Sequence, residues 1–375
     1  MSLRLLHTAD WQLGKPFQNL PTEVAALVRE ARVATVRTIA ALATRHEAAA
    51  VLVAGDIFDS NLVPERTIVQ ALAAMRGFAG PWVLLPGNHD ARLAEGVWSR
   101  LERLGRPENV LLADSPSPIA LADGRLVVLP APLTERHATD DLTAWMDEAT
   151  TSSGALRVGL AHGSIAGRLP EVADAPNPID PERATLARLD YLALGDWHGT
   201  LEIAPRTWYA GTPEPDRFRT NDAGNVLLVE LGEPGEAPPI TRLATARHRW
   251  RQLELDLTGI ADPKAALEPL FAELGGIEQA LVQLTVTGMV DLAGRAALEA
   301  ALERLAGEVC HLEVRDRLLA EPSERDLLAL AGSPVVGGVA RELAALAAED
   351  PAQREVATLA LRLLYLEHHR LGPAA

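Results

Sequence analysis

Five short stretches of the sequence place metal-competent side chains directly after apolar runs. Each run is typical of a buried strand, and the polar residues stand where that strand ends. A lone histidine at a strand end is more often a hydrogen-bonded structural residue than a metal ligand, but five such stretches in series are hard to attribute to chance. They are "ADWQ" (Asp10, Gln12), "AGDIFD" (Asp56, Asp59), "PGNHD" (Asn88, His89, Asp90), "LAHGS" (His162) and "LGDWHG" (Asp196, His198).

These residue types indicate a metal site. In a layered α/β fold the carboxyl ends of the strands gather at one edge of the sheet, where ligands bind. Buried carboxylates that converge there repel each other strongly unless cations hold them. We therefore expect the five stretches to meet around bound cations.

The same series resembles the signature of calcineurin-like metallophosphoesterases, whose usual order is D-x-H, GD-x-x-D, GNHD, H and G-H-x-H. The motifs cover residues 1–220. Several longer phrases resemble the SbcD-type branch, the DNA double-strand-break-repair nucleases that partner an SMC-like ATPase. Those phrases are "HTADWQLGK", "VAGDIFD", "LPGNHD", "YLALGDWHG" and "WYAGTPEPDRF".

The resemblance implies two divalent cations that share a bridging carboxylate, Asp56. A carboxylate of this kind holds two cations ~3.5–4 Å apart, and together they polarise a phosphate and acidify a water. Oxygen-rich ligands with a few imidazoles favour Mn²⁺, with Mg²⁺ or Fe²⁺ as alternatives. The implied ligands are Asp10, Gln12, Asp56 and His198 for the first cation, and Asp56, Asn88, His162 and Asp196 for the second.

Two further residues receive roles from the resemblance. His89 would stabilise the developing charge or protonate the leaving oxygen, and Asp59 would orient it. A simple turn cap is the alternative for Asp59. Two positions depart from the family pattern, because Gln12 and Asp196 stand where histidines are usual. Both exchange nitrogen for oxygen, which favours a retuned metal site over a dead one.

The elements that must position these residues divide the chain into three parts. Strands that first alternate with helices over about 22–45 and 64–78, and then follow in series, predict an α/β sandwich with a mixed sheet over 1–245. The resemblance implies that this sandwich has four layers, α/β/β/α, with mixed sheets. A strand–helix–strand pattern predicts a small α/β domain over 246–320, which resembles the branch's DNA-capping domain. Residues 321–375 are predicted helical, with Ser323 and Asp326 as a capping box.

Composition limits the setting and the partners. The 375 residues are 48% hydrophobic and carry a net charge of −16. An acidic chain is not a strong non-specific nucleic-acid binder by itself, so DNA would need a local basic cluster or a partner that holds the strand. The single cysteine, Cys310, fits a reducing compartment, and no apolar run approaches the ~18 residues of a membrane span. We expect a cytoplasmic protein.

These observations together predict a metal-dependent phosphodiesterase, a DNA exo- or endonuclease in double-strand-break repair. The resemblance implies DNA, an SMC-like ATPase of the SbcC type and a second copy of the chain as partners. Two alternatives stay open: a calcineurin-like phosphoesterase on a non-DNA substrate, and a non-catalytic scaffold for the ATPase. The apolar last helix, over about 351–369, either packs on its own domain or docks the ATPase.

Overall fold

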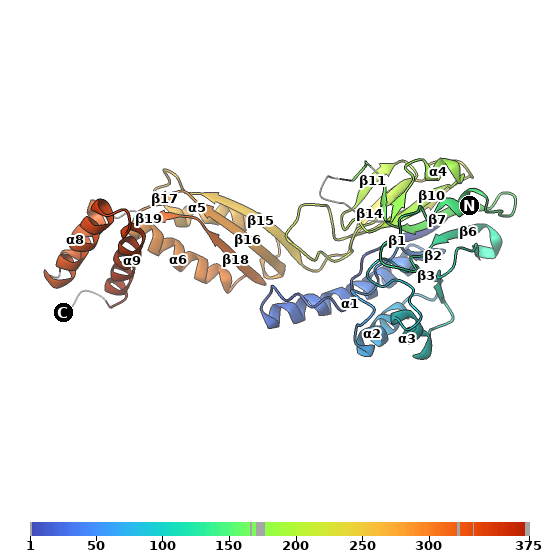
Figure 1. The fold of residues 1–375 in the computed structure, drawn as a ribbon, viewed down its shortest axis with the longest axis horizontal. Coiled ribbons are helices and arrows are strands. Elements are labelled where there is room, and N and C mark those ends of the chain that lie inside the picture. The colour runs from blue at the N-terminus through green and yellow to red at the C-terminus, as the bar shows by residue number, and fades with distance from the viewer. Residues whose placement is uncertain (1, 166, 170–176, 321–322, 333, 372–375) are drawn as a thin grey trace. The chain divides into compact units, whose positions relative to one another are not determined.

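The computed structural model describes residues 2–165, 167–169, 177–320, 323–332 and 334–371, and the chain divides into two compact units. The first is Met1–His248 and the second Arg249–Ala375 (Figure 1). The helices beyond 320 fall in the same unit as the small α/β part. Their separation into a third domain stays a prediction.

The first unit contains two six-stranded mixed sheets. In the first sheet β1 pairs in parallel with β2 and antiparallel with β13. In the second sheet β6, β7, β10 and β12 run parallel, and the outer strands are antiparallel to them. The first sheet has the order β14 (Ile240–Ala244), β13 (Asn225–Leu231), β1 (Leu3–Thr8), β2 (Ala50–Val53), β3 (Trp82–Leu84), β4 (Val110–Leu112). The second has the order β11 (Leu201–Ala204), β12 (Thr207–Tyr209), β10 (Tyr191–Gly195), β7 (Leu156–His162), β6 (Leu126–Ala131), β5 (Ile119–Leu121).

The side chains of β1 show how these sheets become layers. Leu5 belongs to a core that lies between the two sheets, whereas its neighbour Leu6 belongs to the core beneath the helices. Alternate residues of a strand point to opposite faces, so one strand serves both cores. The helices over this sheet are α1 (Thr22–Arg45), α2 (Glu65–Met75) and α3 (Val97–Arg103).

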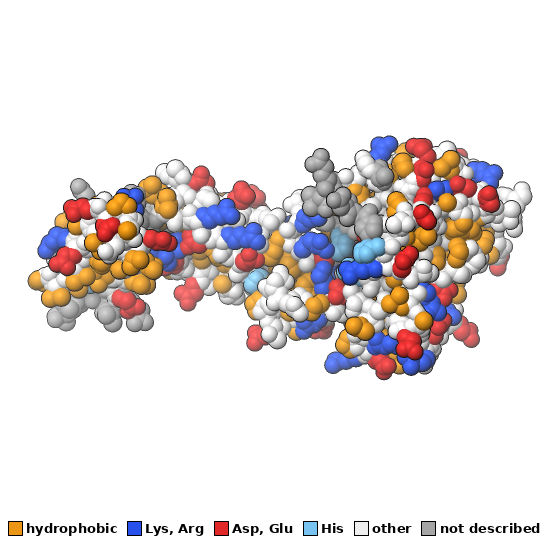
Figure 2. Space-filling model, viewed as in Figure 1, with side chains coloured by type: hydrophobic (Ala, Val, Ile, Leu, Met, Phe, Trp, Pro, Cys, Tyr) orange, Lys and Arg blue, Asp and Glu red, His pale blue; other side chains and the backbone are white. Residues whose placement is uncertain are grey.

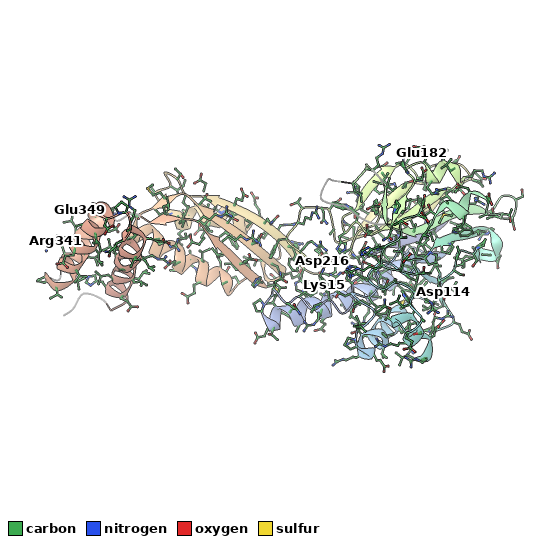
Figure 3. The ribbon with its side chains drawn as sticks, in the orientation of Figure 1. Lys15, Asp114, Glu182, Asp216, Arg341 and Glu349 are labelled. Carbon is green, nitrogen blue, oxygen red and sulfur yellow. The ribbon has the colours of Figure 1, made fainter. Side chains whose placement is uncertain are left out.

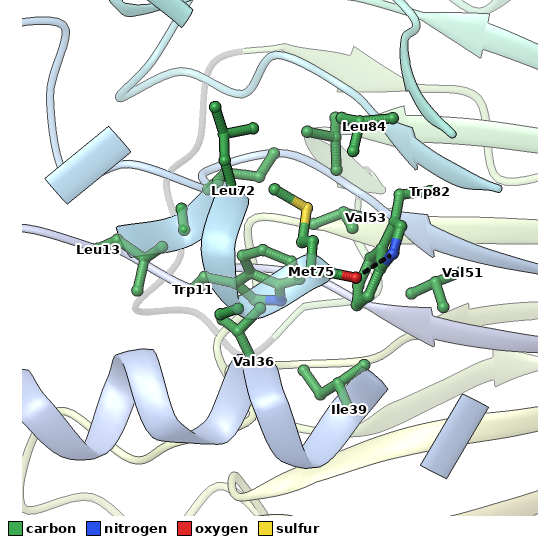
Figure 4. Close-up of a cluster of buried hydrophobic side chains, with 14 of the residues drawn as sticks. Trp11, Leu13, Val36, Ile39, Val51, Val53, Leu72, Met75, Trp82 and Leu84 are labelled. Atoms are coloured by element: carbon green, nitrogen blue, oxygen red, sulfur yellow. Dashed lines mark hydrogen bonds between the residues drawn. The ribbon is translucent and has the colours of Figure 1, made fainter. Parts of the chain in front are cut away.

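The core under these helices is dense with aromatic rings. Trp11 and Trp82 meet edge to face with ring centroids 5.9 Å apart, and the Trp82 indole donates to the Met75 carbonyl at 3.1 Å (Figure 4). A third core covers the outer face of the second sheet, where Ala184 of α4 (Arg183–Leu186) packs with Leu189 and Leu192. The predicted α/β/β/α sandwich with mixed sheets is thereby confirmed.

A buried histidine ties the two sheets together next to the strand ends. His7 Nδ1 lies 2.8 Å from the Tyr191 hydroxyl, and Nε2 lies 3.2 Å from the Leu194 carbonyl oxygen. A carbonyl oxygen can only accept, so Nε2 carries the proton and Nδ1 accepts from the hydroxyl. Burial lowers the pKa of His7 to about 3, against the raising effect of the Leu194 carbonyl. The ring is therefore neutral, and it connects β1 to β10.

His7 makes stability depend on pH in a defined direction. Its folded pKa of about 3 lies below the unfolded value of 6.5, so the unfolded chain takes up this proton first as the pH falls. This contribution is fully present above pH 6.5 and is lost as the pH falls towards 3. His7→Gln, which cannot titrate, should lose less of its free energy of unfolding between about pH 7 and about pH 4 than the wild type does.

Urea unfolding at several pH values measures this difference, and His137→Gln on the exposed surface controls for the loss of a histidine. The free energies of unfolding of the wild type and His7→Gln are compared by their slopes with pH, because His7→Gln also changes the stability at neutral pH. Equal slopes for wild type and His7→Gln would contradict the assignment of a neutral, buried His7.

The second unit is built on a three-stranded parallel sheet. Residues Val282, Leu284 and Val286 of its central strand face a core that α5 and α6 complete. The predicted capping box is confirmed, since Ser323 and Asp326 bond reciprocally. The strands and helices are β15 (Arg249–Asp256), β16 (Ala280–Thr287), β18 (His311–Asp316), α5 (Pro263–Ala272), α6 (Leu292–Ala306), α7 (Glu324–Leu330), α8 (Pro334–Glu349) and α9 (Arg354–Leu371).

The last helix begins later than expected. The predicted start was near 351, but α9 starts at Arg354 because Asp350 caps a separate turn, with the Ala352 N–H donating to its carboxylate at 2.9 Å. Leu361 and Tyr365 of α9 pack with Leu292 of α6 in a small core. Within the described part of the chain, the helices lack the length and apolar character that crossing a bilayer requires.

Candidate metal centre

The loops that follow β1, β2 and β10 hold the candidate ligands in strained backbone conformations. Asp10, Asp56 and Asp196 have φ of 53°, 54° and 100°, in the left-handed region that non-glycine residues rarely enter. Such residues cost on the order of 1–3 kcal/mol each and persist only where the surroundings enforce them. Here the Asp10 N–H donates to the Gly55 carbonyl at 3.0 Å, and the Gln12 N–H donates to the Asp56 carbonyl at 2.9 Å.

Two glycines of the motifs are required because side chains of the cluster lie too close to them for any Cβ atom. A Cβ on Gly55 would lie 2.2 Å from His162 Nδ1, and one on Gly87 would lie 2.3 Å from Asp56 Oδ1. Real Cβ atoms essentially never come so near, so only glycine lets these loops reach the cluster. The "GD" and "GN" pairs of the sequence are thus a packing requirement of the site.

At the centre lie Asp10, Asp56 and His162, all buried, with one ligand atom of each within 4.8 Å of the others. His162 Nε2 is 3.6 Å from Asp56 Oδ1, 3.7 Å from Asp196 Oδ1 and 3.1 Å from Asn88 Oδ1. Its Nδ1 lies 2.8 Å from the Ala54 carbonyl oxygen and must therefore carry a proton. Nε2 is then the nitrogen available to a cation, as in metal sites where the second imidazole nitrogen is fixed by an acceptor.

The other oxygen of Asp56 faces a second group of donors. Gln12 Nε2 donates to Asp56 Oδ2 at 2.8 Å, and His89 Nε2 is 4.0 Å from the same atom. His198 Nε2 lies 3.9 Å from Asp10 Oδ1. The Gln12 amide presents its nitrogen to Asp56, and a half-turn about its terminal bond would present the oxygen instead. Asp56 thus faces His162 with Oδ1 and Gln12 with Oδ2.

The charges in this cluster call for a cation. Burial raises the pKa of Asp10 to about 6, against the lowering effect of His198 and His162. Burial likewise raises the pKa of Asp196. Burial opposes the charged form of His162, but the carboxylates of Asp56, Asp10 and Asp196 outweigh it and raise its pKa to about 9. Three carboxylates, two amides and two imidazoles fit divalent cations that prefer oxygen with some nitrogen.

His89 and Asp59 lie together at the edge of the cluster. The His89 main-chain N–H donates to Asp56 Oδ1 at 2.9 Å, and its Nδ1 lies 2.9 Å from the Asp59 carbonyl oxygen. An orienting role of Asp59 towards His89 would therefore act through the main-chain carbonyl of Asp59. Burial raises the pKa of that carboxyl group.

Asp216 belongs to this site although the sequence motifs did not single it out. Its side chain is 1% exposed and its carboxylate lies 3.3 Å from His198 Nδ1. Lys15 pairs with the same carboxylate, and Arg217 donates to it from Nε at 2.9 Å. Figure 3 labels Lys15 and Asp216 beside each other. Burial raises its pKa, but His198, Arg217 and Lys15 outweigh burial and hold the pKa well below the usual value. Arg217 Nη2 lies 3.0 Å from the same ring nitrogen, so Asp216 and Arg217 together hold the His198 ring with Nε2 towards Asp10.

A buried arginine supports the whole arrangement from α1. Arg32 donates to the carbonyl oxygens of Trp11 at 2.7 Å, Glu214 at 2.9 Å and Asp10 at 3.3 Å, and to the Thr212 hydroxyl at 3.1 Å. The sequence did carry a signal for it, because Arg32 stands among apolar residues on the inner face of the helix. A buried guanidinium must find acceptors, and here they are the main chain beside the ligands.

An open groove of about 410 Å³ gives access to the cluster. Figure 2 shows histidine side chains exposed beside Lys and Arg side chains on the first unit. Positive charge next to a cluster of carboxylates suits a substrate that is itself anionic. The groove is lined by Gln12, Lys15, Pro16, Phe17, Gln18, Asn19, Asp59, His89, His198 and Arg217.

Comparison with known proteins agrees with this geometry. Residues 3–169 match the family model of the calcineurin-like phosphoesterases. The match supports membership of the calcineurin-like metallophosphoesterase superfamily. Within the matched range lie five of the candidate ligands: Asp10, Gln12, Asp56, Asn88 and His162. This superfamily uses divalent metals, which is consistent with the buried cluster.

Two curated proteins are similar over a longer part of the chain. The uncharacterised metallophosphoesterase YhaO of Bacillus subtilis is 26% identical over 241 residues, which is 60% of this chain and 57% of that protein. The DNA double-strand break repair protein Mre11 of Aeropyrum pernix is 26% identical over 278 residues, 68% of this chain and 64% of that protein. The matches thus span less than two thirds of each relative's length.

The Asp216 contact makes a testable prediction about metal affinity. Asp216→Asn keeps the shape of the side chain but removes the charge that orients and polarises His198. We expect the binding step that uses His198 to weaken by about 10–100-fold, the range found when such outer partners of metal ligands are changed. Calorimetric titration of the metal-free protein with Mn²⁺ measures it.

Asp114→Asn provides the matched control, because Asp114 pairs with Arg92 at the surface at 3.0 Å. It should bind Mn²⁺ as the wild type does. If Asp216→Asn also gives the wild-type isotherm while its thermal melt is unchanged, Asp216 does not act on the metal site.

Proposed function

We propose that the chain is a dinuclear-metal phosphodiesterase, a DNA nuclease of double-strand-break repair that works with an SMC-like ATPase. The observation that carries the proposal is the placement of Asp56. Its Oδ1 lies 3.6 Å from His162 Nε2, a proposed ligand of one cation, and its Oδ2 lies 2.8 Å from Gln12 Nε2, a proposed ligand of the other. The likeness to Mre11 of Aeropyrum pernix, by its name a DNA double-strand break repair protein, supports the choice of DNA.

The two proposed ligand sets share Asp56. Divalent cations in such a site polarise a phosphate oxygen and lower the pKa of a water, with Mn²⁺ favoured by the oxygen-rich donors. Asp10, Gln12 and His198 would hold one cation with Asp56. Asn88, His162 and Asp196 would hold the other with Asp56.

The remaining residues of the groove bind and protonate the substrate. Lys15 and Arg217 lie at the groove wall and supply positive charge for a phosphate oxygen. His89, a third exposed, borders the same groove and would give its proton to the leaving oxygen. Asp56 fixes the main chain of His89, so this proton donor and the ligands move as one unit.

The partner proposal rests on the apolar surface of the C-terminal helices. Val356, Leu359 and Leu363 of α9 are 69%, 51% and 54% exposed and recur at helical spacing. Val335 of α8 is 76% exposed, and Figure 2 shows hydrophobic side chains at the surface over these helices. A row of this kind suits a coiled-coil segment of the ATPase. A homodimer is proposed on the resemblance alone, whereas a cytoplasmic location is proposed because the single cysteine, Cys310, fits a reducing compartment.

The nuclease proposal is tested by cleavage of linear duplex DNA with Mn²⁺, Mg²⁺, Zn²⁺ or Fe²⁺. We expect Mn²⁺ to support cleavage best. His89→Asn should lower turnover by about 10²–10⁴-fold, the usual contribution of a positioned proton donor, while both cations still bind. Asp114→Asn should cleave as the wild type does.

The alternatives have distinct outcomes in the same assay. Hydrolysis of bis-p-nitrophenyl phosphate without any DNA cleavage would favour a phosphoesterase on another substrate. Absence of both reactions at millimolar Mn²⁺ would favour the scaffold, in which Gln12 and Asp196 mark a lost activity. Loss of both cations in His89→Asn would make His89 a ligand and remove its proposed role.

If the exposed apolar residues of α9 bind the ATPase, hydrolysis of a small substrate and ATP-stimulated DNA cleavage can be separated by mutation. Leu359→Glu with Leu363→Glu places charge on exposed positions, so the core around Leu361 is kept. This variant should hydrolyse bis-p-nitrophenyl phosphate normally but fail to co-elute with the SMC-like ATPase of its own genome, and lose ATP-stimulated DNA cleavage. Glu355→Gln, exposed on the same helix, is the control. Normal complex formation by the double variant would place docking elsewhere.

A further inference from the structure

A second hollow, distinct from the metal groove, lies between α1 and α2. Its volume is about 560 Å³, which is within the usual range of ligand sites. Two helices form its walls, and one turn of the β1–α1 connection contributes Gly14. The hollow is lined by Gly14, Ala26, Arg29, Glu30, Val33, Arg37, Arg66, Thr67 and Gln70.

The charge of this hollow is opposite to that of the chain as a whole. Three arginines line it against one acid, Glu30, although the net charge of the protein is −16. Arg37 and Arg66 are exposed, and among the described residues neither forms a side-chain hydrogen bond or an ion pair. Arg29 uses one nitrogen to donate to the Pro16 carbonyl at 3.0 Å. The arginines are therefore available to an anion from solution.

Only one turn of chain separates this hollow from the metal groove. Gly14 lines the hollow, while the next residues, Lys15 and Pro16, line the groove that leads to the metal cluster. Arg29 holds this turn in place through the Pro16 carbonyl. Gly14 has φ of 95°, and a Cβ there would lie 2.6 Å from Val63 Cγ1, so the turn is pressed against the protein. The two hollows therefore adjoin across the turn that contains Gly14, Lys15 and Pro16.

We infer that this hollow binds the phosphodiester backbone of the nucleic-acid strand whose scissile phosphate lies at the metal cluster. The inference rests on the proposed function and adds to it a substrate longer than a mononucleotide. Guanidinium groups donate two parallel hydrogen bonds to phosphate oxygens, which is why arginine is favoured at such contacts. A single nucleotide would be served by the metal groove alone, whereas two free arginines beyond the turn serve the neighbouring phosphates.

The test uses two double variants on the same pair of helices. Arg37→Gln with Arg66→Gln removes the two free charges of the hollow. Arg45→Gln with Arg76→Gln removes two exposed charges from the ends of α1 and α2, outside the hollow. Both lower the net charge equally, so a general electrostatic effect would appear in both. Thermal melts verify that each variant is folded.

Binding is measured by fluorescence anisotropy with a labelled single strand of about twelve nucleotides, without added metal and between about 50 and 200 mM salt. The hollow variant should bind at least about tenfold more weakly at low salt. The slope of log K against log salt should fall by about 1.4, since each phosphate contact on a single strand contributes about 0.7. The control variant should keep most of the wild-type affinity and slope.

Activity separates this inference from the function on which it rests. In Mn²⁺ the ratio of kcat/KM on the oligonucleotide to kcat/KM on bis-p-nitrophenyl phosphate should fall about tenfold in the hollow variant relative to the control variant. Equal binding and equal ratios in the two variants would overturn the inference while the phosphodiesterase stands. Weaker binding by the hollow variant, with no hydrolysis of either substrate by the wild type, would uphold the hollow and overturn the function. If the hollow variant binds polyglutamate more weakly than the control variant but binds the oligonucleotide equally well, the inference is wrong and the hollow binds an acidic protein.

Discussion

Mutual repulsion among three carboxylates, two of them buried and the third 15% exposed, is the constraint on which the site depends. Asp10, Asp56 and Asp196 meet at the edge shared by the two sheets, and burial raises the pKa of the first and the last. The fold opposes this repulsion with hydrogen bonds from the loops and with the His162 ring. Divalent cations would offset this repulsion, so binding of metal would also stabilise the folded first unit.

The sequence was sufficient for the layers and for the members of the cluster. Apolar runs that end in polar residues marked strands β1, β2, β7 and β10, and parallel strands bring such ends to one edge. Asp10, Asp56 and His162 meet there, with Asn88, Asp196 and His198 close by. The boundary of α9 was missed by three residues because a local carboxylate cap at Asp350 competes with the helix start.

What the sequence could not supply are the pairings between distant residues. Asp216 stabilises His198, but "EPDRF" has the composition of an ordinary loop and gives no sign that its carboxylate is buried. The main-chain contact of His89 with Asp59 depends on how two loops pack, which residue types alone do not fix. His7 was equally invisible, because a histidine inside an apolar strand is usually only a core residue, whereas here it joins two sheets.

The contacts of Arg32 bear on the order in which parts of the first unit can fold during synthesis. One guanidinium bonds Asp10 and Trp11 near the start of the chain and Thr212 and Glu214 some two hundred residues later. A contact of such long range forms late, because the intervening chain must be closed first. During synthesis the early ligands therefore emerge from the ribosome long before the loop that completes their support. The support of Asp10 and Trp11 by Thr212 and Glu214 is thus complete only in the finished first unit, and the proposed metal site would form no earlier.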